Sequence, residues 1–226
     1  MKSEYEKNGF YLLENAIDAD VVSRLIDELS VFERDMNNYG VRELMNKVPY
    51  IRELATSSPL ITIAGDVLGK NAGPVRSVFF DKVAAANWNV PWHQDTSIAV
   101  GGKSEVPGFG PWSEKQGVTH VEPPPDYLAN MLTLRIHLDA SNADTGGLRV
   151  IPGTHAYGRI GSKRLLEIVE ESQVQECTAN PGDVLLMNPL LFHSSRKAVN
   201  PRHRRIIHIE YSAMDLPHPL AWYEAA

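Results

Sequence analysis

The run Leu132-Thr133-Leu134-Arg135-Ile136-His137-Leu138 decides the fold class, because its apolar and polar side chains alternate without a break. In an extended strand successive side chains point to opposite faces, so Thr133, Arg135 and His137 share one face and the leucine and isoleucine side chains share the other. The run therefore predicts a strand with one face in the core and one polar face turned to solvent or to a pocket.

Short β-rich runs of this kind recur through the second part of the chain and are separated by glycine and proline. They cover residues 76–83, 128–138, 148–151, 183–187 and 205–212. Many short strands with this punctuation are typical of an all-β barrel or jelly roll. We expect residues 75–226 to form this β core.

Residues 1–74 are expected to be mostly helical and to support the β core. Apolar residues recur with helical spacing over 21–32, and a second helix is predicted over 58–68, with Ser58 as its N-cap and Gly69 at its C-terminal end. A further helix over 162–171 is expected to interrupt the strands. All 226 residues are expected to belong to one domain.

The segment 99–125 is rich in glycine and contains three consecutive prolines. This composition disfavours regular structure over most of its length. A loop this long in a small domain is usually functional. We therefore expect residues 99–125 to form a lid.

Composition excludes several classes of function. The net charge of −6, without a long basic cluster, argues against a nucleic-acid partner. The single cysteine, Cys177, permits no intrachain disulfide and no cysteine-based metal cluster, and it fits a reducing compartment. No signal peptide and no membrane-spanning run is recognisable, so the expectation is a cytoplasmic protein that acts on a small molecule.

In a His-x-acid pair, both side chains of an extended segment face the same way. Three such pairs are considered as metal ligands: His93 with Asp95, His137 with Asp139, and His208 with Glu210. Chance alone would produce about one such pair. The first pair opens directly onto the glycine-rich segment, where catalytic groups are enriched. For the other two, a polar pair without a metal is the favoured interpretation.

A facial triad of two histidines and one carboxylate needs a third ligand. His193 is the best candidate, although a histidine at the end of a buried strand can equally be a core residue. Eleven positions on, Arg204 or Arg205 would place a guanidinium fork near the metal, and such a fork suits the far end of a dicarboxylate. The residues alone do not choose between the two arginines.

Taken together, these elements resemble a known family. The matching segments are residues 6–13, Phe80-Asp81-Lys82, Trp92-His93-Gln94-Asp95, residues 147–155 ending in Pro152-Gly153-Thr154-His155, and His193 with Ser195 and Arg204. Over nearly the whole chain the sequence resembles the phytanoyl-CoA dioxygenase family of Fe(II)/2-oxoglutarate-dependent oxygenases. The resemblance implies a mainly β fold with some α, a double-stranded β-helix (a cupin-like jelly roll) with an N-terminal helical supporting layer.

The resemblance also implies the roles of several residues. His93, Asp95 and His193 would hold Fe(II), and Arg204 with Ser195 would bind the distal carboxylate of 2-oxoglutarate. Lys82 would contact the co-substrate, although a lysine on the rim of the barrel explains it as simply.

Three residues are expected at the substrate: Arg135, Trp92 and Gln94. Arg135 on a pocket-facing strand would favour an anionic substrate. The alternative for Arg135 is an ion pair with an acid on a solvated face.

The activity implied by the resemblance is hydroxylation of an unactivated C–H bond of a small, anionic molecule, with O₂ as co-substrate and with release of succinate and CO₂. Asp95 argues against a halogenase, since halogenases of this superfamily carry a small residue in its place. Desaturation, ring formation and epimerisation stay open as outcomes of the same oxygenase chemistry. Two other kinds of protein also stay open: a cupin-like protein that binds a metal or a small molecule, and a metal-dependent isomerase or lyase on the same barrel. The sequence does not indicate an oligomeric state.

Overall fold

A large antiparallel sheet contains the alternating run. The computed structural model describes residues 1–35 and 40–225, and in this part of the chain the strand order is β1-β11-β8-β13-β3-β2. The bounds are β1 (Phe10–Leu13), β11 (Val184–Met187), β8 (Met131–His137), β13 (Arg205–Ser212), β3 (Gly73–Asp81) and β2 (Val41–Arg42). The central strand β8 pairs with β11 on one side and with β13 on the other.

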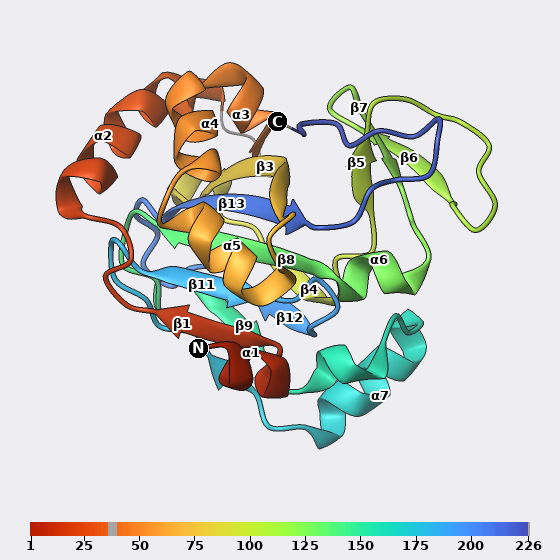
Figure 1. Cartoon of the computed structure of the whole chain (residues 1–226). Helices are drawn as coiled ribbons and strands as arrows, with labels where there is room; N and C mark the ends of the chain where they lie inside the picture. Colours follow the sequence, from red (N-terminus) through yellow and green to blue (C-terminus); the bar gives the residue numbers. More distant parts are fainter. Residues whose placement is uncertain (36–39, 226) are drawn as a thin grey trace.

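A smaller antiparallel sheet lies behind the large one (Figure 1) and encloses a cavity with it. Its strands, in order, are β10 (Gln175–Glu176), β9 (Leu148–Val150), β12 (His193–Ser195) and β4 (Val90–His93). The two sheets form the predicted double-stranded β-helix, and the helices cover the outside, as expected for this fold class.

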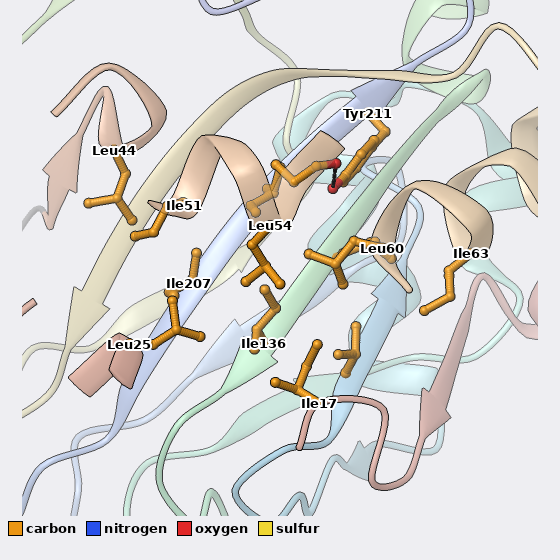
Figure 2. Packing of buried hydrophobic residues seen from close by; sticks show 14 of the residues in the cluster. Ile17, Leu25, Leu44, Ile51, Leu54, Leu60, Ile63, Ile136, Ile207 and Tyr211 are labelled. Atoms are coloured by element: carbon orange, nitrogen blue, oxygen red, sulfur yellow. Dashed lines mark hydrogen bonds between the residues drawn. The ribbon is translucent and has the colours of Figure 1, made fainter. Parts of the chain in front are cut away.

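The N-terminal helices cover the outer face of the large sheet (Figure 1). They are α1 (Lys2–Asn8), α2 (Ala19–Leu29), η1 (Ser30–Asp35), α3 (Leu44–Lys47), α4 (Pro49–Thr56) and α5 (Leu60–Leu68). Figure 2 shows leucine and isoleucine side chains of these helices packed on Ile136 of β8 and Ile207 of β13. Alternation along both strands puts these residues on the outer face, which leaves Arg135 and His208 on the inner, cavity-facing side. The main core therefore lies outside the sheet, and the functional groups lie inside it.

The core packing makes a first prediction. Ile207 is fully buried in the main cluster, so Ile207→Ala should lower the free energy of unfolding by about 2–5 kcal/mol. Urea denaturation of the metal-free protein measures this loss. Val199→Ala is the control, because Val199 is 75% exposed and its truncation should change stability little. A loss below about 1 kcal/mol for Ile207→Ala would contradict tight packing at this interface.

Several element bounds differ from the sequence predictions. The helix expected over 58–68 begins at Leu60, so Ser58 is not its N-cap, whereas Gly69 does end it. The strand expected over 128–138 starts only at Met131, because residues 125–129 form the short helix α6 (Pro125–Ala129). Helix α7 (Ser162–Glu171) has the predicted bounds. The short 3-10 turns η2 (Ala84–Ala86) and η3 (Thr154–Tyr157) complete the helical segments.

The strands β1 and β2 were not expected in the mostly helical first part of the chain. Both attach to the large sheet through pairings that are distant in sequence, β1 to β11 and β2 to β3. Such pairings leave little local pattern in runs of four and two residues.

The segment 99–125 is a folded sheet rather than an irregular loop over much of its length. It contributes to β5 (Ile98–Val100) and contains β6 (Trp112–Lys115) and β7 (Val118–Val121), in the order β5-β7-β6. A two-residue turn joins β6 to β7, with positive φ at both Gln116 (54°) and Gly117 (80°), which is the type I′ geometry that suits a hairpin. Many of the glycines and prolines thus mark turns between short strands.

Within the described ranges, no helix combines the length and the apolar character needed to cross a membrane.

Candidate metal centre

The structure brings together three predicted ligands from two strands of the smaller sheet. His93 ends β4, Asp95 follows two residues later, and His193 begins β12. His93 and His193 lie opposite each other in the antiparallel pair of β4 and β12, and their ring centroids are 4.1 Å apart. Cross-strand pairing thus joins two histidines that are 100 residues apart in sequence.

Both imidazole rings are held by main-chain carbonyls. Nδ1 of His93 lies 2.9 Å from the carbonyl oxygen of Pro91, and Nδ1 of His193 lies 2.9 Å from that of Leu191. Because a carbonyl only accepts a hydrogen bond, each Nδ1 carries the hydrogen and each Nε2 keeps a free lone pair. Orientation of this kind is typical of metal-binding histidines.

The two Nε2 atoms converge on one carboxylate. Nε2 of His93 lies 3.8 Å from Oδ1 of Asp95, and Nε2 of His193 lies 3.7 Å from Oδ2. One ligand atom from each of the three residues lies within 4.8 Å of the other two. Two neutral nitrogens and one carboxylate oxygen are the donor set of the 2-His-1-carboxylate triad, so the residues fit Fe(II).

The protonation states also suit a metal. Burial, reinforced by the neighbouring charge of His93, lowers the pKa of His193 to about 3, so its imidazole is neutral at pH 7. Burial alone would raise the pKa of Asp95, but His193 and His93 beside it hold that pKa well below its usual range. Neither group needs to lose a proton at neutral pH before it binds a metal.

A cavity of about 360 Å³ opens beside these three residues. Its wall contains residues of the large, the smaller and the three-stranded sheet. They are Arg42, Arg76, Phe80, Trp88, Val90, His93, Gln94, Asp95, Thr96, Ser97, Lys115, Arg135, Leu148, His193, Ser194, Ser195, Arg204 and His208. The cavity has the size and the mixed lining of a small-molecule site.

The structure separates the two candidate arginines. Arg204 is 3% exposed and lines the cavity, where its Nη1 donates to the carbonyl oxygen of Gly146 (2.7 Å) and its buried Nε has no partner. Arg205 instead donates to both carboxylate oxygens of Asp139, at 2.8 and 2.9 Å, and does not line the cavity. A buried guanidinium with an unused donor fits the carboxylate of 2-oxoglutarate.

Ser195 and Lys82 occupy adjacent places, one in the cavity wall and one behind it. Nζ of Lys82 donates to Oγ of Ser195 (2.7 Å) and to the carbonyl oxygen of Arg196 (2.6 Å), while Oγ of Ser195 donates to that of Gly146 (2.8 Å). Lys82 is fully buried and is absent from the cavity wall, so it is not a lysine of the barrel rim. The Lys82 amine therefore contacts Ser195 and does not reach the cavity.

Lys82 makes the stability of the fold depend on pH. Burial, and then the charges of Arg204 and Arg135, lower its pKa from 10.5 to about 7. Between these values the unfolded chain binds more protons than the folded one, so the free energy of unfolding rises as pH rises. From about pH 7.5 to about pH 9 the wild type should gain up to about 2 kcal/mol more stability than Lys82→Met. Urea denaturation at each pH tests this, and parallel pH profiles for the two proteins would refute it.

Two predicted substrate residues have structural contacts instead. Trp92 does not line the cavity and packs against the cluster that contains Phe192 and Leu165. Gln94 borders the cavity, but its amide is used by the main chain: Nε2 donates to two carbonyl oxygens, and Oε1 accepts from the amide of Ile160. Both N–H donors of the Gln94 amide are therefore engaged, and Trp92 lies outside the cavity wall.

Arg135 lies in the cavity wall, as one of its two interpretations required, and is not on a solvated face. Its Nη1 lies 3.1 Å from Nδ1 of His208, and its Nε is buried without a partner. His137 is buried farther along β8, where neither ring nitrogen has a hydrogen-bond partner, and it does not line this cavity.

The other two His-x-acid pairs differ from the first. Asp139 is taken by Arg205, and Glu210 pairs with Arg76 at 2.5 Å. Asp95, His208 and Glu210 also lie close enough to share an ion, but this ion pair already neutralises the Glu210 carboxylate. Among the cavity residues that the sequence analysis missed are three cations: Arg42, Arg76 and Lys115.

Comparison with known proteins agrees with this geometry. The sequence profile of the family described as "Phytanoyl-CoA dioxygenase (PhyH)" matches residues 5–206. The chain belongs to this family. It is an Fe(II)- and 2-oxoglutarate-dependent dioxygenase, with Fe(II), 2-oxoglutarate and O₂ as its cofactor and co-substrates. Among curated proteins, no sequence matches the chain.

Solved structures of the same fold are distant in sequence. EctD from S. alaskensis, solved with 2-oxoglutarate and 5-hydroxyectoine, is 20% identical with a TM-score of 0.72, over 93% of this chain and 74% of EctD. AviO1 from Streptomyces viridochromogenes Tue57 is 18% identical with a TM-score of 0.69, over 95% and 94%. HygX from Streptomyces hygroscopicus, solved with iron bound, is 15% identical with a TM-score of 0.67, over 94% and 86%. These similarities establish the shared fold.

Proposed function

We propose that this dioxygenase hydroxylates an unactivated C–H bond of a small molecule, with release of succinate and CO₂. The observation that carries the proposal is the convergence of His93, Asp95 and His193 at the wall of a small-molecule cavity that also contains the buried Arg204. In the solved relatives, 2-oxoglutarate accompanies 5-hydroxyectoine in EctD and nickel in HygX.

In this proposal His93, Asp95 and His193 hold Fe(II). Fe(II) with 2-oxoglutarate and O₂ supplies the oxidant for the C–H bond. The Pro91 and Leu191 carbonyls keep both imidazoles in the tautomer that presents Nε2. Asp95 occupies the ligand position that a halide would need, which favours hydroxylation over halogenation.

Arg204 and Ser195 are proposed to bind the distal carboxylate of 2-oxoglutarate. The unpartnered Nε of Arg204 gains an acceptor when the carboxylate arrives, which removes the cost of a buried, unsatisfied donor. Lys82 orients the Ser195 hydroxyl from behind. The three-stranded sheet, which contributes Lys115 to the cavity wall, takes the place of the predicted lid and shields the site from water.

The proposal also includes the cellular compartment of the protein. A cytoplasmic location agrees with the lone, buried Cys177 and with the need to keep the iron reduced.

The decisive experiment is an anaerobic titration of the metal-free protein with Fe(II) and 2-oxoglutarate. We expect the weak visible charge-transfer band of a bidentate 2-oxoglutarate chelate on iron, followed by formation of succinate when O₂ is admitted. Tight metal binding without this band would instead favour a metal-binding barrel or a metal-dependent isomerase or lyase. Mass spectrometry of the product of a substrate screen then tests for the gain of one oxygen atom.

A further inference from the structure

Three cationic side chains gather at one end of the cavity. Arg42 comes from β2, Arg76 from β3 and Lys115 from β6, and all three line the wall. Arg42 lies opposite Val78 in the pairing of β2 and β3, so it shares the inner face of the sheet with Arg76, two positions along β3. The three-stranded sheet is tied to this corner, since the Gln116 side chain donates to the carbonyl oxygen of Gly40 (3.1 Å).

The three cations differ in how their charge is compensated. Arg76 is neutralised by Glu210 at 2.5 Å. Lys115 donates to the neutral hydroxyl of Ser97 (2.9 Å), and Nε and Nη1 of Arg42 are buried with no hydrogen-bond partner. Among residues 1–35 and 40–225, no carboxylate forms an ion pair with Arg42 or Lys115. Two positive charges thus face the cavity without an anion.

The cations of this cluster repel one another. Burial, followed by the charge of Arg76, lowers the pKa of Arg42 to about 10. Burial and the charges of Arg76 and Arg42 likewise lower the pKa of Lys115, whereas Asp95 and Glu210 oppose the shift. A bound anion would relieve this repulsion.

This cluster is far from the end of the cavity assigned to 2-oxoglutarate. Arg204 precedes the first residue of β13, whereas Glu210, the partner of Arg76, lies six residues farther along the chain. At about 3.4 Å per residue, this separates the backbone positions of Arg204 and Glu210 by roughly 20 Å along the strand. A five-carbon dicarboxylate held by Arg204 therefore leaves the cationic cluster free, and the cluster faces the metal-binding group, since Asp95 interacts electrostatically with both Arg42 and Lys115.

We propose that Arg42 and Lys115 bind an oxyanion of the substrate, a carboxylate or a phosphate ester, and so position its C–H bond at the metal centre. This inference rests on the proposed function and specifies its substrate class. Arg42 supplies buried donors of fixed direction, and Lys115 adds a mobile point charge from the opposite sheet. The Arg76–Glu210 ion pair forms the adjacent wall and contributes no net charge.

The test is calorimetric titration of the anaerobic protein, loaded with Fe(II) and 2-oxoglutarate, with three probes: inorganic phosphate, butyrate and the uncharged butyramide. At least one of the two anions should bind, and butyramide should not. Arg42→Gln and Lys115→Gln should each weaken anion binding at least about tenfold, because each removes a charged hydrogen-bond donor. Preference for phosphate would indicate a phosphate ester, and preference for butyrate would indicate a carboxylate.

Two matched variants separate charge from folding. Arg42→Lys keeps the charge and should retain much of the binding that Arg42→Gln loses, and Lys103→Gln removes an exposed lysine near β5 and should bind as the wild type does. Equal affinity of the wild type, Arg42→Gln and Lys115→Gln would overturn the proposal, as would the absence of anion binding to the wild type. The charge-transfer band is read in the same samples, so its absence reports failure of the proposed function and its presence isolates failure of the anion site.

Discussion

Asp95→Ala should lower the affinity for Fe(II) at least about 100-fold and abolish turnover of 2-oxoglutarate. Asp95 is the only carboxylate on which Nε2 of both His93 and His193 converge within the described part of the chain, and two histidines alone leave the charge of the metal uncompensated. Even loss of a group that only orients a ligand typically costs 10–100-fold in metal affinity, so loss of a ligand should cost more. Anaerobic Fe(II) titration and succinate formation measure the two effects.

A close control for this variant is Asp139→Ala, which alters the same His-x-Asp pattern elsewhere in the chain. Asp139 pairs with Arg205 and does not line the cavity. Its loss should lower the free energy of unfolding by about 1–2 kcal/mol and leave iron binding unchanged. Wild-type iron affinity and turnover in Asp95→Ala would contradict the assignment of Asp95 as a ligand. An equal loss of iron affinity in Asp139→Ala would also contradict it.

Arg204→Ala should raise the KM for 2-oxoglutarate by about 30-fold or more, with a smaller effect on kcat. A buried charge pair that loses one partner typically costs 2–5 kcal/mol, which corresponds to a factor of at least about 30 in affinity. The metal-binding residues do not contact Arg204 through any hydrogen bond that the structure describes, so Fe(II) affinity without co-substrate should persist. Initial rates of succinate formation at varied 2-oxoglutarate concentration, together with the charge-transfer band, measure the change.

Arg205→Ala is the neighbouring control, since Arg205 is bound to Asp139 outside the cavity. It should leave the KM for 2-oxoglutarate near that of the wild type. Arg204→Lys should recover part of the affinity, because it restores the charge but not the planar fork. Loss of kcat at unchanged KM in Arg204→Ala would argue that Arg204 acts on structure rather than on the co-substrate.

Local pattern predicted the strands and their faces well. The alternation around Arg135 placed Leu134 and Ile136 on the core face and Arg135 on the opposite, polar face, and the structure shows that this polar face lines the cavity. Helix α7 was likewise predicted with its observed bounds, because its apolar stripe is a local property. The short strands β1 and β2 were missed, because their pairing partners lie more than 30 residues away and contribute nothing to the local pattern.

The candidate site was predicted unevenly. Resemblance selected His93, Asp95 and His193, which the structure brings together, whereas Lys82 proved to lie behind Ser195, and Trp92 to lie in an apolar cluster. The sequence around a lysine does not show whether its amine contacts a ligand or a buried hydroxyl. Only the packing of β3 against the turn after β12 distinguishes these cases.

The sequence by itself determined the longer strands of the large sheet, which side of each is apolar, and which family the chain resembles. The strands and their faces depend on neighbours one to four positions apart, and the resemblance depends on the order of the motifs along the chain. Only the tertiary structure decided that Arg204 rather than Arg205 faces the cavity, and that Arg42 and Lys115 line the same cavity from two sheets. Those contacts join segments tens of residues apart, so they depend on sheet pairing and burial, which no local pattern encodes.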